Sequence, residues 1–228
     1  MVPVKSPEGD MMTIGYRMLK GYADASFVEK KSRFISYVQP VYSEEEAMQF
    51  LNVIRKKHYD ATHNCYAFIL GDSMNIQRSS DDGEPSGTAG VPILEVLKKE
   101  QLTNSIIIVT RYFGGIMLGA GGLIRAYTEG AACGIKAAGF VKVQPFAVYR
   151  LKMDYSFLSK LQYELPKKDY MIDNIAYLED VTMRVLTEAA KGDEFIENIA
   201  LWTNGIVKAD FLGEQLLKVD ESSGLIIK

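Results

Sequence analysis

The stretch SIIIVTRYFGGIMLGAGGLIRAY, residues 105–127, passes from an apolar run through a glycine-rich loop into an amphipathic segment. Four consecutive β-branched residues at 106–109 are typical of a strand that is buried on both faces. After the loop, apolar residues recur at helical spacing and predict the buried face of a long helix: Ile124, Tyr127, Ala131, Ile135 and Ala138. A buried strand followed by a packed helix predicts a mixed α/β domain that ends near residue 139.

Upstream of this stretch, the pattern predicts two hairpins and two helices. Alternating segments on either side of a charged turn at 29–32 predict the first hairpin. Ser43 and Glu46 have the spacing of a capping box, because each side chain can accept an unpaired amide of the first helical turn. The expected elements are strands at 25–28, 33–38, 65–70 and 74–78, a helix from 43 to about 59 and a short helix from 92 to 99.

Downstream of residue 141 the order changes to βαββαβ, which is typical of a ferredoxin-like sandwich of two helices on an antiparallel sheet. The expected strands are 148–153, 170–177, 181–186 and 206–212, and the expected helices are 155–165 and 194–202. We therefore predict an α+β protein of two domains, 1–140 and 141–228.

The composition excludes several classes of protein. Of the 228 residues, 47% are hydrophobic and 24% are charged, which is the balance of a globular chain rather than a disordered one. The net charge of −3 argues against nonspecific coating of nucleic acid. Cys65 and Cys133 lack the spacing of a zinc site or a disulfide framework, and the chain shows neither a secretion signal nor an apolar run of about 18 residues. We expect a cytoplasmic protein with no membrane partner.

The loop DDGEPSGTAG, residues 81–90, places Asp81, Asp82 and Glu84 within four positions. Carboxylate oxygens are the ligands that Mg²⁺ prefers, so these residues are candidate metal ligands. Consecutive carboxylates rarely converge on one ion, however, and the same residues would place negative charge just before a helix N-terminus. We favour this second interpretation, an acidic turn with no metal or other cofactor.

A second loop, GGIMLGAGG at 114–122, leads into the long helix. Residues without side chains let backbone amides approach a ligand, and a helix N-terminus favours anions such as a phosphate or an RNA backbone. The spacing matches neither the dinucleotide fingerprint nor the P-loop, and tight packing of the helix on the sheet would also need glycine. Arg125 could equally pair with Glu129 one turn away. The candidate anion-binding residues are Arg111, Gly114, Gly115, Gly119, Gly121, Gly122 and Arg125.

The segment HYDATHNC, residues 58–65, places His63 two residues from Cys65 on a predicted strand. Alternate residues of a strand share a face, so a Cys–His nucleophilic pair is one interpretation. No orienting acid is identifiable beside it, and a lone cysteine in a strand is usually a small buried apolar residue. For a catalytic protein, His63 and Glu84 are the candidate acid or base groups.

Four segments, taken together, resemble the IMPACT family in its bacterial two-domain form: EKKSRF at 29–34, ATHNCYAF at 61–68, DDGEPSGTAGVPIL at 81–94 and VTRYFGGIMLGAGGLIRAY at 109–127. The resemblance implies a first domain similar to the fold shared by a small-subunit ribosomal protein domain and domain IV of elongation factor G. It implies a second domain similar to domain V of that factor. Eukaryotic members restrain a stress-responsive translation kinase by competing for its activator, through parts of the chain not evident here.

Three hypotheses follow from the residues and the resemblance. The first is a non-enzymatic, translation-linked binding protein that engages RNA, the ribosome or another anionic partner through the glycine-rich loop. The second is a phosphoryl-transfer or phosphate-ester enzyme, in which the loop 81–84 holds Mg²⁺ and His63 serves as acid or base. The third is an adaptor that binds a protein partner through its second domain. The sequence leaves open the ligand, the oligomeric state and whether the two loops form one site.

Overall fold

The computed structural model describes residues 15–221, 224 and 226–227. It divides into two compact units, which are described separately. The first contains Gly15–Val143 together with the chain from Lys218 onward, and the second contains Gln144–Leu217.

The first unit is built on an antiparallel sheet with the strand order β2-β3-β6-β4-β5. Its central strand is β6, the apolar run that was expected to be buried. At the turn of the first hairpin, Lys30 and Lys31 have φ values of 43° and 65°, which suit a tight two-residue connection. The strands are β2 (Ala23–Glu29), β3 (Ser32–Pro40), β4 (His63–Leu70), β5 (Ile76–Ser80) and β6 (Ser105–Tyr112).

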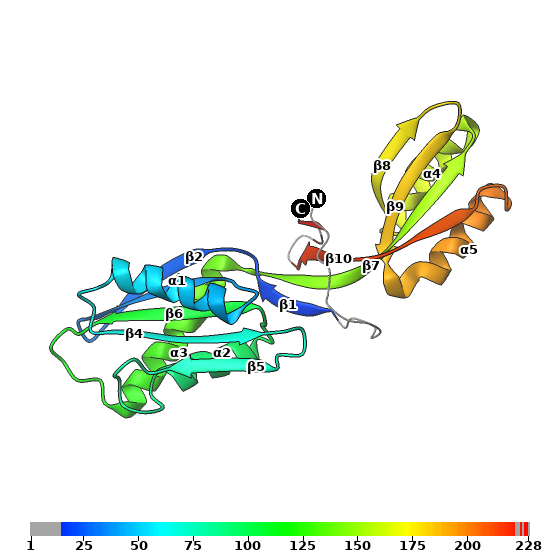
Figure 1. Cartoon of the computed structure of the whole chain (residues 1–228). Helices are drawn as coiled ribbons and strands as arrows, with labels where there is room; N and C mark the ends of the chain where they lie inside the picture. The colour runs from blue at the N-terminus through cyan, green and yellow to red at the C-terminus, as the bar shows by residue number, and fades with distance from the viewer. Residues whose placement is uncertain (1–14, 222–223, 225, 228) are drawn as a thin grey trace. The chain divides into compact units, whose positions relative to one another are not determined.

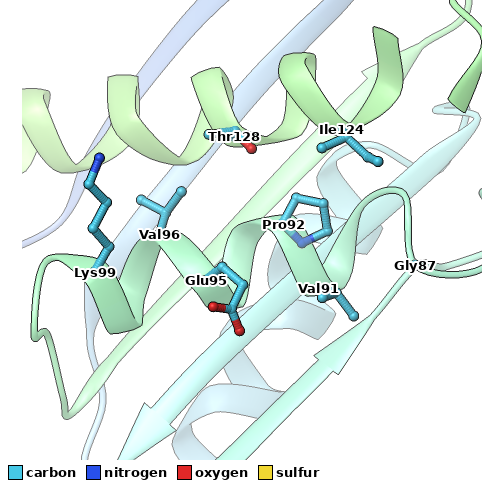
Figure 2. Close-up of a pocket in the computed structure, with 8 residues that line it drawn as sticks. All are labelled: Gly87, Val91, Pro92, Glu95, Val96, Lys99, Ile124 and Thr128. Atoms are coloured by element: carbon cyan, nitrogen blue, oxygen red, sulfur yellow. The ribbon is translucent and has the colours of Figure 1, made fainter. Parts of the chain in front are cut away.

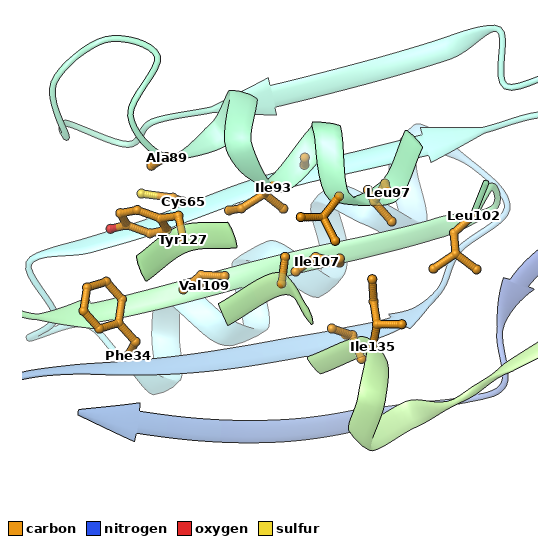
Figure 3. Packing of buried hydrophobic residues seen from close by; sticks show 14 of the residues in the cluster. Phe34, Cys65, Ala89, Ile93, Leu97, Leu102, Ile107, Val109, Tyr127 and Ile135 are labelled. Atoms are coloured by element: carbon orange, nitrogen blue, oxygen red, sulfur yellow. The ribbon is translucent and has the colours of Figure 1, made fainter. Parts of the chain in front are cut away.

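Helices cover both faces of this sheet (Figure 1). Helix α1 (Glu44–Lys57) packs on one face, and the Ser43 side chain accepts from the Glu46 amide as the capping pattern predicts. Helices α2 (Gly90–Lys99) and α3 (Ala120–Ala138) pack on the other face, over a core that includes Phe34, Cys65 and Tyr127 (Figure 3). Within the described residues, none of the helices has the length and apolar character needed to cross a bilayer.

Two short strands of the first unit have no counterpart in the sequence prediction. Strand β1 (Tyr16–Leu19) pairs with the first residues of β7 (Phe140–Met153). The last residues of β10 (Ala209–Asp220) pair with β11 (Ile226–Ile227), and Arg17 forms an ion pair with Glu221. These contacts explain why the chain from Lys218 onward groups with the first unit, whereas the predicted division assigned all of 141–228 to the second.

The second unit has the predicted βαββαβ order, so the α+β prediction is confirmed. Its strands lie in the order β10-β7-β9-β8, and a cluster that includes Leu151, Tyr170 and Phe195 fills the space between the sheet and the helices. Asp154 begins the first helix by accepting the Ser156 amide. The remaining elements are α4 (Tyr155–Lys167), β8 (Met171–Tyr177), β9 (Val181–Glu188) and α5 (Gly192–Thr203).

Candidate functional site

Three neighbouring strands place Phe34, Arg111 and His63 in one row across the sheet. In the antiparallel register, Arg111 on β6 lies opposite Phe34 on β3 and opposite His63 on β4. Directly opposite residues point to the same face, and Phe34 belongs to the core beneath α2 and α3. The register therefore brings together two predicted site residues, Arg111 and His63, that are 48 positions apart in the sequence (111 minus 63).

Arg111 forms a buried ion pair with Glu84, from the acidic loop. Its Nη1 lies 2.6 Å from Glu84 Oε1, and the two side chains are only 6% and 3% exposed. The Tyr127 hydroxyl, on α3, donates to the same oxygen at 2.7 Å, and Arg111 Nη2 donates to Ser32 Oγ at 3.3 Å. The prediction of Arg111 as a free anion ligand therefore needs correction, because its charge is already matched by a carboxylate.

His63 is held in one orientation by the acidic loop. Its Nδ1 lies 2.8 Å from the Asp82 carbonyl oxygen, which can only accept, so this nitrogen carries the proton in the neutral ring. The other nitrogen, Nε2, lies 3.8 Å from Glu84 Oε2, and neither atom has a hydrogen-bond partner among the residues that the structure describes. With a neutral imidazole, the site thus presents two adjacent acceptors to which no described residue donates, while the buried Nε of Arg111 lacks an acceptor among the described residues.

The three carboxylates of the acidic loop point in different directions. Asp81 accepts the amides of Gly87, Ala89 and Gly90; burial opposes its ionisation, but these bonds outweigh burial and hold the pKa of Asp81 below its ordinary value. Asp82 binds Arg55 at 2.6 Å, and Glu84 faces Arg111. Across residues 15–221, no group of three histidine, cysteine or acidic side chains is placed to hold a metal ion. The three carboxylates that were candidate Mg²⁺ ligands therefore do not converge on one point. Asp81 instead accepts backbone amides at the beginning of α2.

The glycines of the second loop have different roles. The Gly114 amide donates to Ser32 Oγ, and a Cβ at this position would overlap the Lys31 carbonyl group, so Gly114 allows the hairpin turn to pack closely and does not offer its amide to a ligand. Gly114 is partly buried and Gly122 is buried against Leu118, whereas Gly115 and Gly121 are exposed.

Helix α3 begins without a side-chain cap. Its N-cap residue is Gly119, whose φ of 71° lies in the left-handed region that favours glycine. The amides of Ala120, Gly121 and Gly122 form no hydrogen bond with any described residue, so the positive end of a 19-residue helix is left open. The sequence analysis predicted that backbone amides of the glycine-rich loop bind an anion. The amides at the beginning of α3 are free to do so, whereas the Gly114 amide is not.

Both loops line a single pocket of about 500 Å³. Glu84 and Pro85 come from the acidic loop, and Gly119 and Ala120 come from the beginning of α3. The two loops therefore form one site, a question that the sequence left open. The remaining lining residues are Thr62, His63, Arg111, Phe113, Met117, Leu118 and Leu123.

Arg125 lies outside this pocket, in a neighbouring hollow of about 310 Å³ that Leu118 separates from it. Lys30 and Glu129 line the same hollow, but the predicted pair between Arg125 and Glu129 is not formed within 4.0 Å. In the described part of the chain, Arg125, Lys30, Lys31 and Arg33 have no ion-pair partner. Three of these unpaired cations, Arg125, Lys30 and Lys31, lie on the hairpin turn and helix that flank the glycine-rich loop. Arg33 alternates with Phe34 along β3 and therefore faces the α1 side of the sheet.

A third hollow, of about 360 Å³, lies between α2 and α3 (Figure 2). Val91, Val96 and Ile124 give it an apolar wall, while Glu95 and Lys99 also line it. None of the predicted catalytic, anion-binding or metal-binding residues lines this hollow.

Two family models match this chain, one within each of the two units. Residues 30–135 match the Impact N-terminal domain, and residues 151–205 match a domain of unknown function, DUF1949. The IMPACT family member YvyE of Bacillus subtilis is 40% identical over 211 residues, which cover 92% of this chain and 96% of YvyE. This chain belongs to the IMPACT family. The IMPACT family member YigZ of Escherichia coli is 36% identical over 194 residues, covering 84% of this chain and 92% of YigZ.

A solved structure supports the fold of this IMPACT family chain. The crystal structure of a hypothetical protein has a TM-score of 0.55 and 33% sequence identity, and the match covers 87% of this chain and 98% of that one.

Sequence reasoning assigned Tyr127 only to the core and did not single out Phe113, Met117 or Thr62. A buried tyrosine needs a partner for its hydroxyl, and this requirement was the available signal for Tyr127. Burial raises the pKa of Tyr127 well above its ordinary value, so the phenol keeps its proton and acts as a donor to Glu84. No comparable signal existed for the pocket walls, because their placement depends on how the loop folds.

Proposed function

We propose that this IMPACT family protein is a cytoplasmic, translation-linked binding protein that engages RNA through the beginning of α3 and the surrounding cations. The observation that carries the proposal is the open first turn of α3 at the edge of the pocket. Its unbonded amides and positive helix end suit an oxygen of a phosphate group. The link to translation rests on the family resemblance.

The charge distribution supports contact with a polyanion at this place. The whole chain has a net charge of −3, so binding must depend on a local surface rather than on total charge. Lys30, Lys31 and Arg125 supply that surface, since none of them is neutralised by an ion pair among the described residues. Glu29 and Glu129 line the same hollow as Lys30 and Arg125 and reduce its positive charge. Each phosphate contact made by such a side chain releases counterions, which makes the affinity fall with salt.

The test is co-sedimentation of the full chain with ribosomes and with single-stranded RNA over a range of salt concentrations. We expect Arg125→Glu combined with Lys30→Glu to weaken binding at low salt and to reduce the slope of affinity against salt. Lys160→Glu together with Lys142→Glu gives the same change of charge at two exposed lysines that do not line the pocket, and should have little effect. Absence of salt-sensitive association by the unmutated protein would overturn the proposal.

A further inference from the structure

We propose that the pocket receives an unstacked ribonucleotide base that carries an amino group, with guanine as the base that fits best. This inference rests on the proposed function, since it names the base that the pocket binds when the RNA backbone lies against the beginning of α3. It starts from two adjacent acceptors of the pocket lining, Glu84 Oε2 and His63 Nε2, which are 3.8 Å apart.

The Glu84 carboxylate has only one oxygen in use. Oε1 accepts from Arg111 and Tyr127, whereas Oε2 has no hydrogen-bond partner among the described residues although the side chain is only 3% exposed. This oxygen lines the pocket and is not among the fully buried unsatisfied atoms of the described residues, so a ligand that enters the pocket can reach it and donate to it. A backbone phosphodiester cannot supply that donor, because it has no proton to donate and carries negative charge. The inner part of the pocket therefore suits a different portion of the ligand from the beginning of α3.

The ligand must present two neighbouring hydrogen-bond donors on one edge of a planar ring. His63 Nδ1 is committed to the Asp82 carbonyl, so neutral His63 offers Nε2 as a second acceptor beside Glu84 Oε2. Guanine presents two adjacent donors, its ring N–H and its amino group, on one edge. Adenine and cytosine present an amino group beside a ring acceptor, and uracil places its single N–H between two carbonyl oxygens. For a site with two neighbouring acceptors, we therefore expect guanine to bind most tightly and uracil most weakly.

The walls of the pocket suit a base. Phe113 is half exposed, and Met117 and Leu118 extend the apolar side, so a base can stack or pack against them. A volume of about 500 Å³ is within the range of small-ligand sites. Gly119 and Ala120 lie at the same pocket, which places the helix amides where a nucleotide phosphate can reach them.

The experiment is titration of the full chain with guanosine monophosphate and inosine monophosphate, which differ only by the amino group, followed by NMR or calorimetry. We expect guanosine monophosphate to bind at least tenfold more tightly, because inosine leaves one acceptor unpaired. Uridine monophosphate and inorganic phosphate should bind more weakly still. Equal binding of the guanosine and inosine nucleotides would overturn the inference.

Variants test the residues that are assigned to the pocket. His63→Gln and Phe113→Leu should each weaken guanosine monophosphate binding severalfold, whereas Phe211→Leu, the same change at an exposed phenylalanine of the second unit, should not. Neither pocket variant removes the buried ion pair, so both should fold. Unchanged affinity in both would overturn the inference.

An oligonucleotide arm separates this inference from the proposed function. RNA containing guanosine should bind more tightly than the same strand with inosine, in a salt-sensitive manner. Salt-sensitive RNA binding without this difference would overturn the base pocket and leave the proposed function standing. Selective mononucleotide binding without RNA binding would overturn the proposed function and assign the pocket to a free nucleotide.

Discussion

Glu84 Oε1 accepts both Arg111, at 2.6 Å, and Tyr127, at 2.7 Å, so one carboxylate oxygen joins the central strand to the long helix. The acidic loop that carries Glu84 is thereby fixed over the sheet. The contact is structural, and it leaves the second oxygen of the same carboxylate directed toward His63.

Removing the positive partner of this ion pair should be strongly destabilising. Arg111→Met leaves the Glu84 carboxylate buried without its counter-charge, and we expect a loss of about 3–5 kcal/mol in the free energy of unfolding. Urea unfolding measures this loss. Arg150→Met, which breaks an exposed pair with Asp210, should cost less than about 1 kcal/mol. A similar small cost for both variants would contradict the structural role of the buried pair.

Replacing Asp81 should destabilise the protein in a pH-dependent manner. The folded-state pKa of Asp81 lies below its unfolded value because three amide bonds outweigh the effect of burial. Its contribution is therefore fully present above about pH 4 and is lost as the pH falls through the folded-state pKa. We expect Asp81→Ala to cost about 1–2 kcal/mol at pH 7. Thermal unfolding of the unmutated protein and of Asp81→Ala at pH 7 and at pH 2–3 checks this. If the difference in stability between the two proteins is the same at both pH values, the prediction is wrong.

Cys65 should resist thiol reagents in the folded protein. Its side chain is fully buried, and burial raises its thiol pKa well above the ordinary value, so the reactive thiolate is scarce. Cys133 is only partly buried and should react first. In a Cys133→Ser variant, mass spectrometry should detect labelling of Cys65 only at urea concentrations that unfold the first unit. Rapid labelling of Cys65 without urea would show that the pocket region opens readily.

Two glycines of the loop should respond oppositely to alanine. At Gly114 a Cβ overlaps the Lys31 carbonyl group, so Gly114→Ala forces the hairpin turn to move and should cost about 1–3 kcal/mol. At Gly121 the nearest atom to an added Cβ is the end of the Arg125 side chain at 3.7 Å, and alanine favours helix. Gly121→Ala should therefore be neutral or stabilising. Denaturant unfolding midpoints of the two variants test this. A lower midpoint for Gly121→Ala than for Gly114→Ala would contradict the packing role of Gly114.

Most of the helices and strands could be predicted from the sequence, because each of these has a local signal. The Ser43 cap, the apolar strand at 106–109 and the βαββαβ order of the second unit all appear at their predicted places. Strand β1 escaped prediction because it is four residues long and its partner lies on β7, more than 100 positions away.

The site was predicted in part. His63, Glu84 and Arg111 were candidates for separate roles, but their meeting depends on the register of β4 against β6, which no local pattern reveals. The divergence of Asp81 and Asp82 from Glu84 has the same cause, since each carboxylate finds a partner from a different element. Arg125 remains beside the loop but lines a separate hollow.

The shared oxygen of Glu84 also ties the acidic loop to parts of the chain that are synthesised after it. Its partners lie 27 and 43 positions further along the chain, on a strand and a helix. A product that ends before residue 127 lacks the Tyr127 hydroxyl, so Glu84 Oε1 would lose one of its two donors.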